Sequence, residues 1–281
     1  MMVYGIKMLN IYDITLKELQ NQLILKGLPR FAAVQIFGWI YKKRAEDFDL
    51  MTDISKDSRV FLKKNFKFSK ADILKQEKSL DGTEKFLFKL EDLSSIETVF
   101  IPEKKRSTLC ISTQVGCKYR CEFCASGFNG FKRNLRACEM INQYLQVCDS
   151  IPSQGITNIV FMGIGEPLDN FDNLIKTIEI LTASKGLALS KKKISISTCG
   201  LVPQIDKLSA LNLGVRLSVS LHSADEAVRS KLMPINKKYP LGKLLKSVRG
   251  FIRSSKEAVT FEYVLIKDIN ASQDDAKRLA K

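Results

Sequence analysis

Long hydrophobic runs are missing from this sequence. No stretch approaches the roughly eighteen uninterrupted apolar residues that a membrane-spanning helix needs. The N-terminal residues also lack the basic segment, apolar run and small-residue cleavage site that together mark a secretory signal. We therefore expect a cytoplasmic protein with no membrane partner.

Acidic residues and histidine are both scarce. The chain has 281 residues, with 30 Asp and Glu against 45 Lys and Arg, a formal net charge of +15 and a single histidine, His222. This balance favours a polyanionic partner, most simply nucleic acid, although a generally lysine-rich proteome would produce it too. The apolar content of 45% is ample for one large domain with a smaller one attached.

The N-terminal third has a helical pattern. Apolar residues recur at helical spacing in 15–26, 31–42 and 56–66. We expect residues 1–95 to form a small helical N-terminal domain with a short β extension.

From residue 96 onward, short β-rich runs alternate with amphipathic segments. The predicted strands are 108–114, 156–162, 193–198, 215–221 and 258–266, and the predicted helices are 136–149, 171–184, 203–212 and 240–254. Ser272 begins a further segment that looks like a capped helix. The βαβα order predicts an α/β fold with a parallel sheet and right-handed crossovers, which means an open or closed barrel over residues 96–281. In such barrels the chemistry gathers at the carboxyl ends of the strands.

Cysteines are the most informative residues. There are seven, an odd number that argues against a disulfide framework in a cytoplasmic chain. Cys117, Cys121 and Cys124 form a CxxxCxxC motif in the loop after the first predicted barrel strand. Three thiolates leave one coordination position open, whereas a closed structural zinc site or an ordinary ferredoxin cluster uses four ligands. The alternative is a zinc site completed by a distant cysteine or by His222.

Three other strand ends carry residues suited to a small polar ligand. Gly165 and Glu166 follow the strand TNIVFM, where glycine lets a backbone approach a ligand and a carboxylate accepts hydrogen bonds from an amino group. Ser197 ends one later strand, and Ser220, Leu221 and His222 end the next. We expect these side chains to point into the mouth of the barrel, although a Gly-rich turn alone is also a common plain connection.

The CxxxCxxC motif, with Phe123 before its last cysteine, resembles the cluster signature of radical S-adenosylmethionine (SAM) enzymes. Within them, the chain is similar to the RlmN-type methyltransferases through CISTQVGC, GIGEPLDN, SISTCGLVP and LMPINKKYP, and through GLPRFAAVQIFGWIYKK near the N-terminus. The resemblance implies a partial (β/α) barrel of the radical SAM type. It also implies a 4Fe-4S cluster on the three cysteines and SAM as a second cofactor, bound by Gly165, Glu166, Ser197, Ser220, Leu221 and His222.

The activity implied by the resemblance is methylation of carbon 2 of adenine in 23S rRNA and tRNA, through a methyl-cysteine intermediate and a transient disulfide. Cys110 matches the family's resolving cysteine, and Glu97 matches its proton acceptor. Without the resemblance, Cys110 would be read as a core residue and Glu97 as a solvent-facing strand residue. Cys138, Cys148 and Cys199 match no family role and are interpreted as small hydrophobic residues.

Two positions of the family pattern have no counterpart here. The family continues past the equivalent of Lys281 with a SAM-contacting asparagine and the methyl-carrying cysteine, so we expect an incomplete chain that lacks the last barrel unit. The competing interpretations are an inactive remnant, a noncatalytic nucleic-acid-binding protein with a structural metal centre, and a relative that methylates carbon 8. The family also implies an electron donor such as flavodoxin. We expect a monomer whose RNA contacts include Lys42, Lys43 and Arg44.

Overall fold

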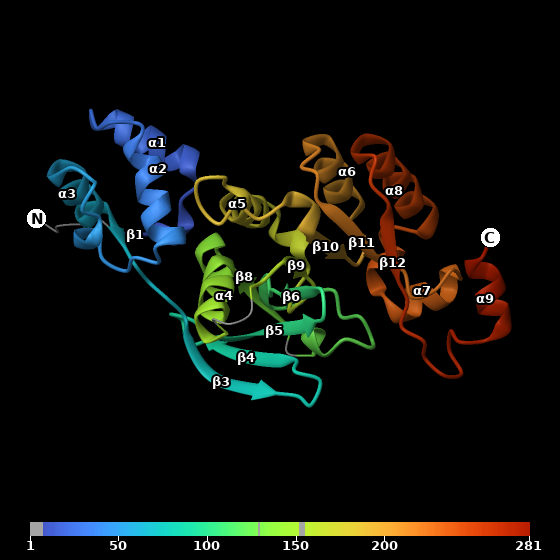
Figure 1. Cartoon of the computed structure of the whole chain (residues 1–281). Coiled ribbons are helices and arrows are strands. Elements are labelled where there is room, and N and C mark those ends of the chain that lie inside the picture. Colours follow the sequence, from blue (N-terminus) through green and yellow to red (C-terminus); the bar gives the residue numbers. More distant parts are fainter. Residues whose placement is uncertain (1–7, 129, 152–154) are drawn as a thin grey trace, which may run out of the picture.

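The computed structural model describes residues 8–128, 130–151 and 155–281. An eight-stranded sheet runs through the middle of the molecule, with strand order β12-β11-β10-β9-β6-β5-β4-β3. The N-terminal helices lie at one end, and the C-terminal residues lie beyond the opposite edge of the sheet (Figure 1). Within the described ranges, no helix combines the length and the apolar character needed to cross a membrane.

The N-terminal helices agree closely with the predicted segments. They are α1 (Leu16–Leu25), α2 (Ala32–Phe37), which continues as a π-helical turn over Gly38–Lys42, and α3 (Lys56–Asn65). Thr15 caps α1, and the Glu18 side chain bonds back to the Thr15 backbone. The strands β1 (Leu9–Asn10) and β2 (Phe66–Lys67) pair in parallel and bring the two ends of this helical region together.

The β extension is larger than the sequence pattern predicted. The strands β3 (Asp72–Lys78), β4 (Glu84–Lys89) and β5 (Ser95–Glu103) form an antiparallel wing that continues into β6. Five of the seven residues of β3 have exposed charged or polar side chains, so this edge strand has little apolar periodicity to recognise.

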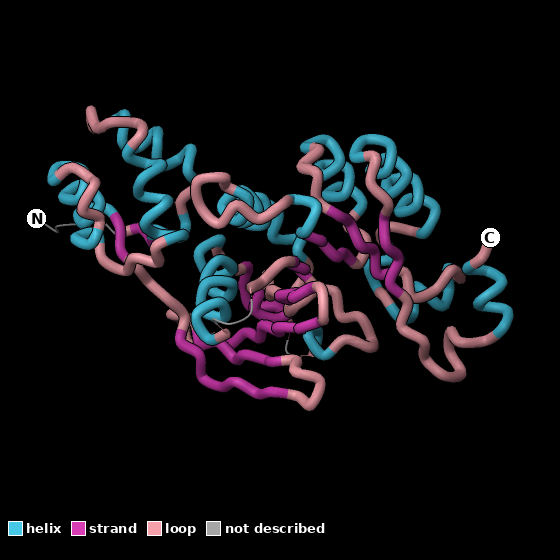
Figure 2. Tube along the Cα trace, viewed as in Figure 1, coloured by secondary structure: helices cyan, strands magenta, loops and turns pink. Residues whose placement is uncertain are grey.

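The barrel half contains the five strands that the sequence predicted. They are β6 (Arg106–Cys110), β9 (Asn158–Phe161), β10 (Ile194–Thr198), β11 (Arg216–Ser220) and β12 (Val259–Glu262), and neighbouring strands pair in parallel. The first ends at Cys110, earlier than predicted, because residues 114–116 form the separate strand β7. β12 and β3 lie at opposite edges of the described sheet, so these strands form an open, partial barrel (Figure 2).

Helices cover the outer face of the barrel strands. The four predicted helices are present as α4 (Ala137–Ser150), α5 (Phe171–Thr182), α6 (Val202–Leu211) and α8 (Leu241–Ser255). α7 (Glu226–Leu232) was not predicted, because it has only seven residues. α9 (Gln273–Leu279) begins at the predicted Ser272 cap.

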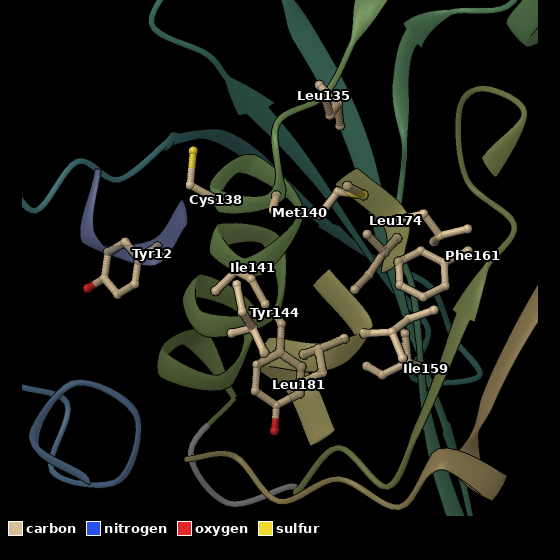
Figure 3. Packing of buried hydrophobic residues seen from close by; sticks show 14 of the residues in the cluster. Tyr12, Leu135, Cys138, Met140, Ile141, Tyr144, Ile159, Phe161, Leu174 and Leu181 are labelled. Carbon is tan, nitrogen blue, oxygen red and sulfur yellow. The ribbon is translucent and has the colours of Figure 1, made fainter. Parts of the chain in front are cut away.

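Strand alternation separates the core from the functional face. Ile159 and Phe161 of β9 are fully buried, near Ile141 of α4 and Leu174 of α5 (Figure 3). The intervening Val160 pairs with Cys110 on one side and with Ser195 on the other. Because side chains alternate between faces, Cys110, Ser195 and the other residues in this register lie on the inner face of the barrel.

Candidate active site

The three motif cysteines lie in a loop that is held between β7 (Gln114–Gly116) and β8 (Phe131–Asn134). Gly116 has φ +73°, and a Cβ there would meet the Gly130 oxygen at 1.7 Å, so only glycine fits this turn. The backbone N–H of Cys117 donates to Gly130 O at 3.1 Å, and that of Cys124 donates to Cys121 O at 3.0 Å. These contacts fix the backbone of the loop, and its three cysteines are half-buried.

The cysteines open into a cavity of about 490 Å³ at the carboxyl ends of the parallel strands. Its walls also contain most of the strand-end residues that the sequence singled out. These are Gly165, Glu166, Ser197, Ser220 and His222. Leu221 is buried but does not line the cavity, since its backbone instead bonds to Glu262 O and to the Arg229 side chain.

The donor set fits a cluster better than a single metal ion. Among the described residues, no three His, Cys, Asp or Glu side chains are gathered tightly enough to hold one ion. A 4Fe-4S cluster has several iron atoms, so its thiolate ligands need not converge on one point. Burial raises the pKa of the Cys117 thiol to about 11 and that of Cys121 to about 12. The free thiols therefore stay protonated at neutral pH, and metal binding releases their protons.

Two glycines bring the β9 loop close to the neighbouring strand end. A Cβ on Gly163 would meet the Ser112 backbone nitrogen at 2.7 Å, and one on Gly165, where φ is +102°, would meet Gln114 Cβ at 2.4 Å. This close approach places Glu166 in the cavity wall with 4% of its surface exposed.

The Glu166 carboxylate already has backbone partners. It accepts hydrogen bonds from Leu168 N at 3.0 Å and from Cys199 N at 2.7 Å. Burial raises the pKa of Glu166 in spite of these bonds. The carboxylate therefore ties the β9 and β10 loops together at the cavity, in addition to any ligand that it binds.

Glu262 joins the predicted serines, although the sequence did not single it out. Its Oε2 accepts hydrogen bonds from Ser197 Oγ at 2.9 Å and from Ser220 Oγ at 3.4 Å. All three residues line the cavity. The sequence did not reveal this contact, because Glu262 meets Ser220 only through the register of β11 and β12.

His222 occupies a fixed position in the same wall. Its φ of +53° is unusual for a residue with a side chain. Nδ1 accepts a hydrogen bond from Val264 N at 3.0 Å, and the ring packs edge-on against Phe123 with centroids 4.5 Å apart. Burial lowers the pKa of His222 to about 4, so the imidazole is neutral at physiological pH and carries its proton on Nε2.

Arg229 is a supporting residue that the sequence did not reveal. It is fully buried on α7. Its guanidinium donates to three backbone oxygens, Leu221 O at 3.1 Å, Cys199 O at 3.0 Å and Ser220 O at 3.0 Å, and to Asn236 Oδ1 at 2.5 Å. It therefore holds together the ends of β10 and β11, from which the cavity residues project.

Cys110 and Glu97 lie on the same face of the β5–β6 pair. Cys110 is opposite Val99, and Glu97 is two residues from Val99 on β5, so the side chains are diagonal neighbours. Burial raises the pKa of the Cys110 thiol to about 11. Glu97 forms an ion pair with Lys85 at 3.1 Å and borders a second cavity of about 560 Å³ that Lys132 also lines.

The three cysteines without a predicted role differ from one another. Cys138 is buried in the core, and Cys148 is half-buried on α4. Cys199 is buried in the hydrophobic core, as predicted, and it also lines the cavity with the motif cysteines. It follows the end of β10 at Thr198, which places it at the carboxyl end of the strand.

Comparison with known proteins agrees with this geometry. Residues 111–280 match the model of the radical SAM superfamily. Residues 9–67 match the ribosomal RNA large subunit methyltransferase N-terminal domain.

Individual relatives cover nearly the whole chain. The dual-specificity RNA methyltransferase RlmN of Campylobacter lari is 44% identical over 97% of this chain and 80% of its own length, and that of Bdellovibrio bacteriovorus is 43% identical over 97% and 68%. The crystal structure of a radical SAM methyltransferase from Sphaerobacter thermophilus superposes with a TM-score of 0.89 at 39% identity, over 97% of this chain and 81% of that one.

These matches favour the methyltransferase interpretation over a noncatalytic metal-binding protein. Radical SAM methyltransferases use a 4Fe-4S cluster and SAM, so the matches also support these two cofactors. The chain belongs to the RlmN-type RNA methyltransferases of the radical SAM superfamily.

Proposed function

We propose that this chain methylates carbon 2 of adenine in 23S rRNA and in tRNA. The observation that carries the proposal is a single cavity in which the three motif cysteines meet Glu166, Ser197 and His222. Its relatives are named dual-specificity RNA methyltransferases, which supports two classes of RNA substrate.

In this proposal Cys117, Cys121 and Cys124 hold the 4Fe-4S cluster, and the strand-end residues hold SAM. When bound, the cluster supplies the electron that cleaves SAM and begins the radical chemistry. The protein's part is to bind and orient SAM. Gly165 admits the ligand, Glu166 and the serine hydroxyls accept and donate hydrogen bonds, and the neutral His222 donates from Nε2. Leu221 does not line the cavity, and its part is to support the site through its backbone bonds to Glu262 and Arg229.

Cys110 and Glu97 serve the RNA side of the reaction. Cys110 is the resolving thiol, which attacks the sulfur of the family's methyl-carrying cysteine in the protein–RNA adduct. The sulfur–sulfur bond forms as the bond from that sulfur to carbon breaks, and the carbon keeps the electron pair and takes up a proton to become the methyl group. Glu97 accepts the proton that leaves carbon 2. Their shared sheet face supports this division, because it places both near the inner side of the barrel and leaves Glu97 more than 40% exposed for a substrate.

The N-terminal domain is the part that we expect to hold RNA. Of the three basic residues expected there, Arg44 is engaged within the protein, where it bonds to Asp149 and to Leu145 O at 2.7 Å each. Lys43 lies 3.4 Å from the centre of the Trp39 ring. Lys42 is exposed and remains the candidate for a phosphate contact. We further propose a cytoplasmic monomer that is reduced by a flavodoxin-like donor.

The test is nucleoside mass spectrometry of RNA from cells that lack this gene and cells in which it is restored. We expect 2-methyladenosine to disappear from both 23S rRNA and tRNA, to return with the wild-type gene, and to stay absent with Cys110→Ala. Cys148→Ala is the matched control, because this half-buried cysteine lies on α4 and not on the β5–β6 face that holds Cys110 and Glu97, and it should restore the modification. Loss of 8-methyladenosine instead, or no change in either nucleoside, would contradict the proposal.

A further inference from the structure

Cys199 is a fourth cysteine in the wall of the cluster cavity. It lies just after β10, is 9% exposed, and shares the cavity lining with Cys117, Cys121 and Cys124. The proposed function assigns a role to the other three thiols but none to Cys199.

The backbone of Cys199 is fixed on both sides. Its N–H donates to Glu166 Oε2 at 2.7 Å, and its carbonyl accepts from the buried Arg229 guanidinium at 3.0 Å. The next residue, Gly200, has φ +111° and is packed against the Leu244 side chain. The thiol is therefore held at the cavity, and only rotation about its own side-chain dihedral changes its position.

A second observation shows that this part of the cavity is built for a ligand. His222 is 4% exposed, and its Nδ1 is already occupied by Val264 N. Among the described residues its Nε2–H makes no hydrogen bond, and the residue lines the cavity, so this donor is available to a bound ligand.

Three cysteines leave one iron of the cluster without a protein ligand. When bound, SAM would take that position, and without SAM the open iron would adjoin a cavity whose wall also contains Cys199. We propose that Cys199 binds the open iron while SAM is absent and gives it up when SAM arrives. This inference rests on the cluster ligation in the proposed function, and it is independent of which RNA atom is methylated.

The exchange involves ligands and protons but no electrons. When the iron–sulfur bond forms, the Cys199 thiol releases its proton to solvent. When SAM enters, its amino and carboxylate groups replace the sulfur on iron, and the thiolate takes up a proton again. Cys199 would thus protect the site from losing its open iron, and SAM would have to compete with it.

The experiment uses the full chain, reconstituted anaerobically, in wild-type, Cys199→Ser and Cys148→Ser forms. Each is titrated with ferricyanide, with and without saturating SAM, and the 3Fe-4S cluster that forms on loss of the open iron is counted by electron paramagnetic resonance. Without SAM, we expect Cys199→Ser to yield several-fold more 3Fe-4S signal than wild type and Cys148→Ser to match wild type. With SAM the difference should disappear.

SAM affinity is the second measurement. Because a competing ligand lowers the fraction of protein that is ready to bind, removing it should tighten apparent SAM binding several-fold in Cys199→Ser and in Cys199→Ala. Circular dichroism of the apo proteins tests whether the variants fold. Equal 3Fe-4S yields together with equal SAM affinities would overturn the inference alone, and a folded wild-type protein that takes up no cluster would overturn the proposed ligation along with it.

Discussion

Replacing Arg229 with methionine should be among the most damaging single changes in this fold. Methionine retains much of the volume of the side chain but removes every donor. Three backbone oxygens and Asn236 Oδ1 would then lose their guanidinium partner inside the protein. Each hydrogen bond from a charged donor contributes about 1.5–3 kcal/mol, and an unpaired buried acceptor carries its own penalty.

The loss is partly offset, because the variant no longer buries a charge. Burial lowers the pKa of Arg229, which reflects this cost. Losing the partner of a buried acceptor costs about 1–3 kcal/mol, and for several such acceptors, after the offset, we expect Arg229→Met to destabilise the protein by about 3–5 kcal/mol. Total stabilities are only about 5–15 kcal/mol, so the variant should be close to unfolding at 37 °C.

The assay is anaerobic urea denaturation of the apo protein, followed by circular dichroism. Arg249→Met is the matched control, because Arg249 is exposed on α8, and it should change the free energy of unfolding by less than about 0.5 kcal/mol. Arg229→Lys should be intermediate, since one ammonium cannot reach four acceptors in a planar fork. If Arg229→Met unfolded within about 1 kcal/mol of wild type, the reasoning would be refuted.

Two further changes test the loop geometry and the pH dependence. Gly165→Ala should abolish SAM binding, measured by equilibrium dialysis, because the added Cβ would overlap Gln114. Gly250→Ala is the control, since it lies in open space on α8 and should stabilise the fold by roughly 0.5–1 kcal/mol. Equal SAM affinity in the two variants would contradict this reasoning. Hydrogen bonds from Ser69 and Lys67 lower the pKa of Glu91 from 4.5 to about 2, so its contribution is complete above pH 4.5 and is lost as the pH falls toward 2. Glu91→Gln should therefore lower the free energy of unfolding by about 1 kcal/mol at pH 7, after allowance for solvent screening, and by almost nothing near pH 2. Urea titrations at the two pH values measure this difference. An equal loss at both would show that the charge is not responsible.

The sequence by itself determined the N-terminal helices, most of the alternating strands and helices of the barrel half, and the cluster motif. Helical and alternating periodicities predicted the helices from α1 to α8, apart from α7, and the five parallel strands of the main sheet. These signals are local, because each element buries one face and its apolar residues repeat with the period of that element. The CxxxCxxC spacing is equally local, since Cys117, Cys121 and Cys124 act through one loop.

Only the tertiary structure decided which distant residues meet. The pairing of Glu262 with Ser220, and the proximity of Cys199 to the motif cysteines, depend on strand register and on how far each loop turns. Arg229 looks like a surface residue of a short helix until packing buries it. These contacts join residues thirty or more positions apart, except for those that Arg229 makes with its nearer neighbours, and no local pattern records them. The positions of these residues are set by how the strands and helices pack together to bury the apolar face of the sheet. The sequence alone therefore identified the cofactors of the cavity, but not the residues that support it.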